Sequence, residues 1–195
     1  METKKFELTS DTKIVFGKKL FRIKALIDFG NVNKGELGGY VEKEENLSHE
    51  GNAWAYGDAI VYGNARICGN AIVYGDAEIC DDAIVYGNAE VYGNAKVYDD
   101  AEIYGNAWIC GDAEIYGDAD YLCFKGLGSC NRNTTFFKCK DGHIHVACGC
   151  FGGDLDEFAA KVRETHGNST YAREYLACID VVKIHFGIEE GKNGN

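Results

Sequence analysis

Histidine and cysteine have the most obvious chemistry in this sequence, and four of them fall within eight positions. His143 and His145 are followed by Cys148 and Cys150, and imidazole with thiolate is a common zinc ligand set. Side chains of a strand alternate between two faces, so positions 143 and 145 face away from 148 and 150 unless Gly149 forms a bulge. The spacing therefore predicts buried thiols beside two histidines, with no metal and no other cofactor.

A strictly repeated segment precedes this cluster. Residues 51–122 divide into twelve consecutive six-residue units without insertion, of which GNAIVY and GDAEIC are typical. The third position is always Ala, and the fifth is Ile or Val in ten units. Strand alternation turns both positions inward, and Gly followed by Asn or Asp supplies a corner that tolerates positive φ. Three units close one coil, so the repeat predicts a parallel β-helix of about four coils.

The repeat units resemble the hexapeptide-repeat left-handed β-helix family, in which an aliphatic residue recurs every sixth position, two places after a small one. The left hand is implied by this resemblance and not by the spacing. Nearly the whole chain also resembles uncharacterised hexapeptide-repeat proteins of phages and prophages of gut bacteria. The segments concerned are GELGGYVEKEENLSHEGNAWAYGDA, the YGNA units, TTFFKCKDGHIHVACGCF and THGNSTYAREYLA. This second resemblance implies an architecture and a phage-like origin, but no activity.

Acyltransferases with the same repeat provide an enzymatic alternative. They use a catalytic His, usually beside a loop that leaves the coil, and hold the acyl donor between subunits. The units here are uninterrupted, and His49 is the one histidine beside them. We interpret His49 as a solvated terminal residue, so no catalytic residue is predicted. An acyltransferase that uses His49 or a pocket at a trimer interface remains the alternative.

Smaller elements are predicted on either side of the repeat, within a fold that is mainly β. Residues 1–38 should form a β-hairpin cap turning at Gly17-Lys18, because an open coil exposes unpaired backbone groups. Residues 39–122 should form the β-helix, of four to five coils if residues 39–50 are imperfect first units. In these first units we place Val41 and Leu47 in the Ala position.

The C-terminal part predicts a small α+β unit over residues 123–188. Asp-Gly at 141–142 between two alternating runs indicates a β-hairpin. Asp154 with Glu157 is a capping box that opens a helix to about residue 165, and apolar spacing predicts a second helix over about 170–186. Residues 189–195 are predicted to be a disordered tail.

Negative charge is concentrated on the repeat. Of the formal net charge of -11, residues 1–34 contribute +4, residues 35–122 contribute -15 and residues 123–195 contribute zero. A short basic cap does not dominate such a chain, so we do not expect the coil to bind nucleic acid directly.

Because units three apart stack on one side, the charged residues can be mapped further. One side carries only amides at the second position of its units, namely Asn52, Asn70, Asn88 and Asn106. Another side collects the carboxylates of Asp81, Asp82, Asp99, Asp100, Glu102, Asp118 and Asp120. Stacked like charges repel, so stability does not explain them. Three explanations remain open: solubility, a surface for a basic partner, or Ca²⁺ bridging the first four aspartates.

Large apolar side chains are predicted beside the Asn ladder. Trp54, Ile72 and Trp108 should point outward there, with Tyr56, Tyr74 and Tyr92 at the corner. Apolar patches are seldom left bare, so we expect these residues to pack under a terminal segment or a neighbouring subunit. A homotrimer about the helix axis, common in the repeat family, would use this side.

The sequence thus predicts a non-enzymatic, phage-encoded interaction protein. Its expected partner is a basic host protein of a defence or nucleic-acid-handling kind, which it binds and inhibits through the acidic side of the β-helix. The alternatives are an acyltransferase and a structural protein of a virion or polymer. No run of 18 apolar residues occurs and residues 1–10 are polar, which predicts a cytoplasmic protein without membrane segment or secretory signal, its thiols reduced.

Overall fold

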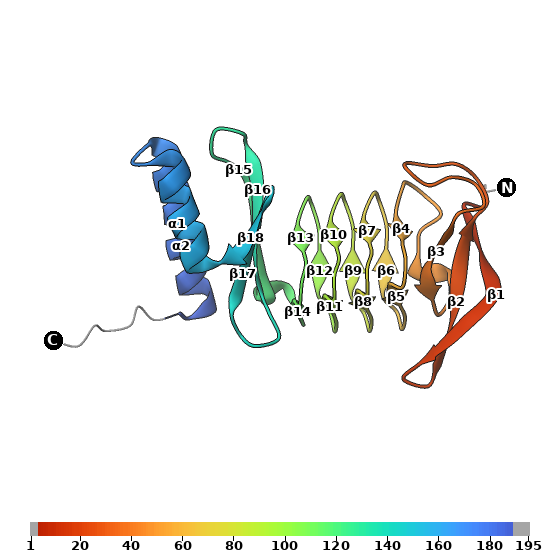
Figure 1. Cartoon of the computed structure of the whole chain (residues 1–195). Helices are drawn as coiled ribbons and strands as arrows, with labels where there is room; N and C mark the ends of the chain where they lie inside the picture. Colours follow the sequence, from red (N-terminus) through yellow and green to blue (C-terminus); the bar gives the residue numbers. More distant parts are fainter. Residues whose placement is uncertain (1–3, 189–195) are drawn as a thin grey trace. The chain divides into compact units, whose positions relative to one another are not determined.

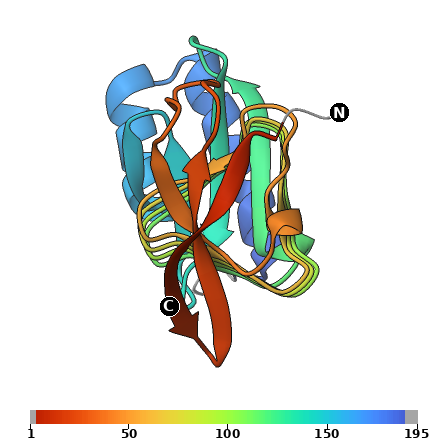
Figure 2. The same cartoon turned by 90° about the vertical axis from the view of Figure 1, so that its right-hand side faces the viewer.

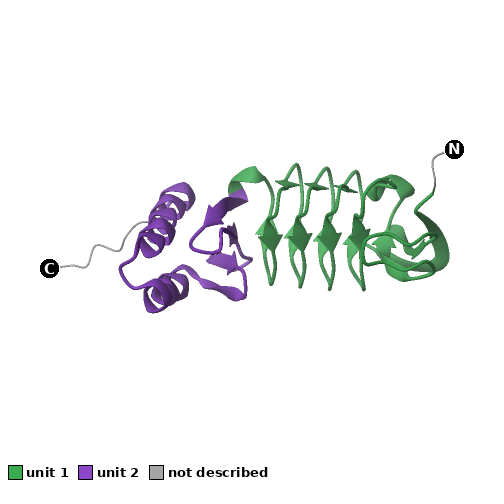
Figure 3. Ribbon diagram, turned by 90° about the horizontal axis from the view of Figure 1, so that it is seen from above, with its two compact units in different colours: residues 1–119 green, residues 120–195 purple. Residues whose placement is uncertain are grey.

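The computed structural model describes residues 4–188, and the chain divides into two compact units, Met1–Ala119 and Asp120–Asn195 (Figure 3). The tail expected at 189–195 lies outside the described residues. None of the helices within residues 4–188 is long and apolar enough to cross a membrane.

The repeat forms a parallel β-solenoid of about four turns, as the sequence predicts (Figure 1). Two-residue strands follow one another at six-residue intervals: β4 Trp54–Ala55, β5 Ile60–Val61, β6 Arg66–Ile67, β7 Ile72–Val73, β8 Glu78–Ile79, β9 Ile84–Val85, β10 Glu90–Val91, β11 Lys96–Val97, β12 Glu102–Ile103, β13 Trp108–Ile109 and β14 Glu114–Ile115. They stack on three sides, as β4-β7-β10-β13, β6-β9-β12 and β5-β8-β11-β14. Figure 2 looks along this stack, where successive coils overlie one another.

The solenoid interior is filled by the two inward positions of each unit. The Ala of the third position is fully buried from Ala53 to Ala113, and so is the fifth-position residue from Ala55 to Ile115. Burying one Val or Ile side chain contributes about 1.5 to 3 kcal/mol, so the repeated small-then-branched pattern supplies the stability of each coil. Side chains at the fourth and sixth positions lie outside this interior.

The solenoid begins earlier than its regular units, in a register that our frame did not predict. Strand β3 (Leu37–Val41) pairs in parallel with β5, and Val41 lies opposite Val61. Leu47 lies opposite Ile67 in the same way, after the short 3-10 helix η1 (Glu44–Asn46). Val41 and Leu47 therefore occupy the fifth position and not the Ala position, because two additional residues enter the chain between Leu47 and Ala55.

The N-terminal hairpin consists of the antiparallel strands β1 (Phe6–Val15) and β2 (Lys18–Ala25). Strand β2 also pairs with β3 in antiparallel orientation. It covers part of one outer side as well as the end of the solenoid. Leu20 packs there in a buried cluster with Tyr40, Ile60, Tyr62 and Cys80. The hairpin thus removes the open edge that a bare coil would expose.

The second unit is an antiparallel sheet with two helices. Its strands are β15 (Tyr121–Leu127), β16 (Arg132–Lys138), β17 (Ile144–Cys148) and β18 (Phe151–Asp154), paired in that order. The predicted β16–β17 hairpin is present, whereas β15 and β18 were not predicted. Helices α1 (Leu155–His166) and α2 (Thr170–Phe186) match the expected ranges, and the capping box of Asp154 and Glu157 opens α1.

Candidate functional site

The structure brings together four of the predicted carboxylates, which we call the acidic file: Asp81, Asp82, Asp99 and Asp100. They occupy the corners that lead into β9 and β12, which are paired on the same side of the solenoid. The backbone N–H of Asp82 donates to the carbonyl oxygen of Asp99 at 2.9 Å, so the two corners stack directly. All four residues are exposed. Adjacent rungs are about 4.8 Å apart, which keeps the charges close.

Hydrogen bonding distinguishes this corner from the amide ladder. On the Asn side, Asn52 donates to Asn70, which donates to Asn88, which donates to Asn106, at 3.0 to 3.1 Å. An amide both donates and accepts, so such a ladder satisfies itself, whereas a carboxylate only accepts. Within residues 4–188, no donor reaches the carboxylates of Asp99 and Asp100, and none of the four aspartates forms an ion pair. The file therefore offers acceptor oxygens to solvent or to a partner.

Backbone strain is a second distinctive property of the acidic file. Asp81 has φ 59° and Asp99 has φ 48°, in the left-handed region that Gly occupies at the same corner position of most other units. A residue with a Cβ costs about 1 to 2 kcal/mol there, less for Asp and Asn than for others. Together with like-charge repulsion, this strain means that Gly would suit the fold better at both positions.

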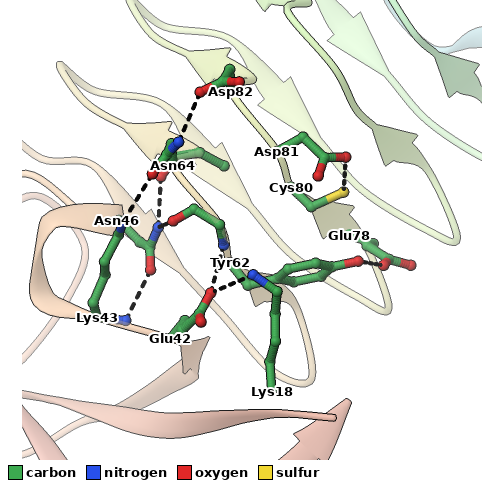
Figure 4. A network of polar contacts seen from close by, with 12 residues as sticks. Lys18, Glu42, Lys43, Asn46, Tyr62, Asn64, Glu78, Cys80, Asp81 and Asp82 are labelled. Atoms are coloured by element: carbon green, nitrogen blue, oxygen red, sulfur yellow. Dashed lines mark hydrogen bonds and ion pairs between the residues drawn. The ribbon is translucent and has the colours of Figure 1, made fainter. Parts of the chain in front are cut away.

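The N-terminal end of the file is closed by a polar network (Figure 4). Lys43 donates to the side-chain oxygen of Asn64 at 3.1 Å, and the Asn64 amide donates to Asp82 at 3.0 Å. The Cys80 thiol donates to Asp81 at 3.2 Å. Asn64 thus takes the second position of the preceding rung, where it ends the run of carboxylates.

Three other predicted members of this surface lie differently. Asp118 belongs to the 3-10 helix η2 (Asp118–Asp120), where its Oδ1 accepts from the backbone N–H of Glu102 at 2.9 Å. Glu102 is half-buried and accepts from the Tyr86 hydroxyl at 3.3 Å. Asp120 lies in the second unit and pairs with Lys138 at 2.6 Å. Asp120 is therefore not part of the coil, because the last repeat unit leaves the coil at η2.

A second acidic corner exists on the side of β5, β8 and β11, which the sequence reasoning did not single out. It carries Asp58, Asp76 and Asp112, with Asn94 between the last two. Lys13 of the N-terminal hairpin donates to the carbonyl oxygen of Asp58 at 3.1 Å. Burial lowers the pKa of Lys13, and the carboxylates of Asp58 and Asp76 oppose that shift. Lys13 thus lies beside this corner, whereas among the described residues no lysine or arginine forms an ion pair with the acidic file.

Comparison with known proteins agrees with the repeat architecture. A family model described as the YdcK beta solenoid repeat matches residues 65–78. The match runs from Ala65 through β6 and β7 to the start of β8, so it covers less than one full coil. No curated protein sequence matches the chain. These findings support a β-solenoid repeat protein and bring no activity with them.

His49 is held by the N-terminal segment, which corrects its interpretation as a solvated residue. Its Nδ1 accepts from the backbone N–H of Lys5 at 3.1 Å, and its Nε2 contacts Glu44 at 2.6 Å. The ring stacks on Phe6, with centroids 4.3 Å apart. Both ring nitrogens are therefore engaged, Nδ1 with the N-terminal segment and Nε2 with η1.

The apolar side is partly covered by the chain itself. Trp54 is fully buried, with Phe29 and Phe6 at 5.3 and 6.2 Å between ring centroids, so a terminal segment packs on it as expected. Ile72 and Trp108 remain half-buried, and Glu90 lies between them on paired strands. At the corner, Tyr56 is half-buried, and Tyr74 stacks on Tyr92 at 4.8 Å. The patch that remains is interrupted by a charge.

A bridging cation has no support at the acidic file. A Ca²⁺ site requires six to eight oxygen ligands that converge on one point. Within the described part of the chain, three or more carboxylates nowhere lie close enough together to share one ion. The calcium alternative for Asp81, Asp82, Asp99 and Asp100 is therefore not favoured by the geometry.

Proposed function

We propose that this chain is a non-enzymatic interaction protein whose acidic file binds a basic macromolecular partner. The observation that carries the proposal is the pair of stacked, strained corners with exposed carboxylates that no basic group of the described chain neutralises. Natural sequences retain strain and repulsion mainly where they serve a function. A soluble rod would not need Asp at the two glycine positions.

The chemistry of the file favours arginine-rich surfaces. Carboxylates on adjacent rungs accept from guanidinium groups in a planar, two-bond geometry that adds specificity to the charge attraction. The carboxylates project from a hydrogen-bonded solenoid, so little backbone ordering is required on binding. Nucleic acids also present closely spaced negative charges, so a protein cleft that binds phosphate backbones is a suitable partner.

We further propose, from the resemblance to phage and prophage proteins, that the partner is a bacterial host protein in the cytoplasm. A defence or nucleic-acid-handling factor would have the required basic surface, and occupation of that surface would inhibit it. A protein that occupies the basic cleft with its own carboxylates would compete directly with the nucleic acid for that cleft.

Capture from a lysate of a gut bacterium tests this proposal with a charge-matched control. The test variant carries Asp81→Asn, Asp82→Asn, Asp99→Asn and Asp100→Asn, which the fold tolerates because Asn64 already occupies this corner and Asn accepts positive φ. The control removes the same charge elsewhere, by Asp58→Asn, Asp76→Asn, Asp112→Asn and Glu114→Gln. Quantitative mass spectrometry compares the proteins recovered with each chain.

We expect the wild type and the control to recover the same basic proteins, and the test variant to lose them by about tenfold or more, since close charge pairs contribute several kcal/mol at protein interfaces. Equal recovery by the wild type and the test variant would remove the acidic file from the proposal. Equal loss in both variants would show that net charge, and not this surface, governs capture.

A further inference from the structure

A cluster of potential metal-binding side chains lies in the second unit. Cys139, His143 and His145 each offer one ligand atom, and these three atoms lie within 4.8 Å of one another. The set differs from the one that sequence spacing indicated, because Cys148 and Cys150 are not part of it. We propose that Cys139, His143 and His145 form a zinc-binding site.

The β16–β17 hairpin explains why these three residues meet. Lys138 pairs with Ile144, and the backbone N–H of Cys139 donates to the carbonyl oxygen of His143 at 3.0 Å, so Cys139 lies opposite His143. Directly opposite residues of an antiparallel pair have neighbouring side chains on the same face. His145 is two residues further along β17 and shares that face.

The thiols near the hairpin divide between its two faces, as strand alternation requires. Cys148 is buried with Ile144 and Val146 in the core beneath the helices, where it accepts from the Thr134 hydroxyl at 3.2 Å. Cys150 is exposed beyond the end of β17. Cys139, by contrast, lies on the histidine face and is only 7% exposed.

A carboxylate supports one of the histidine ligands. Asp141 accepts from the backbone N–H of His143 at 3.2 Å and also contacts its Nδ1. A carboxylate on one nitrogen orients the ring and leaves the other nitrogen, Nε2, for the metal, an arrangement common around zinc. Gly152 lies on the neighbouring strand, and a Cβ atom at this position would lie only 3.3 Å from Nε2 of His145. The absence of a side chain at Gly152 therefore leaves space around Nε2 of His145.

The donor set favours zinc over harder ions. One thiolate with two imidazoles suits Zn²⁺ in tetrahedral geometry, whereas Mg²⁺ and Ca²⁺ require oxygen ligands. Ligand atoms around tetrahedral zinc are about 3.3 to 3.8 Å apart, so the three ligand atoms, which lie within 4.8 Å of one another, need to approach by about 1 Å at most. His143 lies in the exposed turn region, which permits this adjustment and leaves a fourth position for water.

Cobalt is a suitable probe, since a Co²⁺–thiolate bond gives a charge-transfer band and tetrahedral Co²⁺ gives strong visible bands. The full-length chain is treated with chelator and reductant and then titrated with Co²⁺ alone, followed by Zn²⁺. We expect one Co²⁺ per chain with both spectral features, and their loss as Zn²⁺ displaces the cobalt.

Variants assign the ligands. Cys139→Ser should abolish the charge-transfer band, His143→Asn should weaken Co²⁺ binding at least tenfold, and Asp141→Asn should weaken it by about 10- to 100-fold. Cys150→Ser and Cys130→Ser, at exposed thiols, should leave the titration unchanged. A band that is missing from the wild type, survives Cys139→Ser or disappears in Cys150→Ser would overturn the proposal. If Cys139→Ser does not fold, the test rests on His143→Asn, because His143 is exposed and its substitution should not disturb the fold. An unchanged affinity of this variant for Co²⁺ would refute the site.

Discussion

Gly51→Ala should lower the free energy of unfolding of the solenoid by about 2 to 5 kcal/mol, the sum of left-handed strain and overpacking. Gly51 has φ 68°, and a Cβ there would lie far inside van der Waals contact of the Gly69 carbonyl. That oxygen already accepts from the backbone N–H groups of Asn52 and Ala53, so it cannot move without loss of hydrogen bonds between rungs.

Gly57 provides the matched control for this change. Its φ of 61° is similar, but the nearest atom to an added Cβ is 3.8 Å away, so only the strain of about 1 to 2 kcal/mol applies. Both variants are compared by urea unfolding in a Trp108→Phe background, in which the buried Trp54 reports on the first coil. Equal destabilisation by the two substitutions would show that the stacked corners are looser than described.

One buried lysine should contribute a component of the free energy of unfolding that increases between about pH 8 and pH 10.5, measured as the difference between the wild type and Lys5→Met. Lys5 is 1% exposed, its Nζ donates to the carbonyl oxygen of Ala53 at 2.9 Å, and burial lowers its pKa to about 8. Between the two pKa values the unfolded chain holds a proton that the folded chain has released, so folding becomes more favourable as pH rises.

The size of this effect follows from the pKa difference. A shift from 10.5 to about 8 corresponds to about 3 kcal/mol, gained progressively up to pH 10.5 and absent below pH 8. Lys5→Met should remove this component, whereas Lys4→Met, at an exposed neighbour that pairs with Glu44, should retain it. Urea unfolding at several pH values measures the difference; parallel pH profiles of wild type and Lys5→Met would refute the assignment.

Local sequence patterns predicted the parts of the fold that local interactions determine. Ala at the third position of every six-residue unit, with Ile or Val two places later, fits a coil that buries both positions, and the structure contains this coil. The helices were also predictable, since the capping box at Asp154 and the apolar spacing after Thr170 are short-range signals.

The features that were missed depend on contacts between distant residues or on weak local signals. The last unit leaves the coil at η2, and Tyr121, which stands where most units have Ile or Val, begins β15 instead. Strand β18 contains Gly152 and Gly153, which have low strand propensity. The burial of Trp54 requires Phe6 and Phe29, which the spacing of the repeat does not reveal.

The candidate sites likewise differ in how far local sequence patterns predict them. The acidic file was predictable from the sequence, because a coil of fixed length places units that are three apart next to each other. The spacing of His and Cys residues along one strand did not indicate Cys139, because Cys139 joins the proposed zinc site from the other strand of the hairpin. The Asp-Gly turn at 141–142 already predicted which residue lies across the hairpin, so Cys139 could have been included.

The affinity of an oligo-arginine peptide for the full-length chain tests the function of the acidic file most directly. Calorimetry at low and physiological ionic strength compares the wild type, the variant with Asn at positions 81, 82, 99 and 100, and the charge-matched control. We predict salt-sensitive binding that the test variant weakens by about tenfold or more and that the control retains nearly in full. Indistinguishable affinities for the wild type and the test variant would contradict the proposed function.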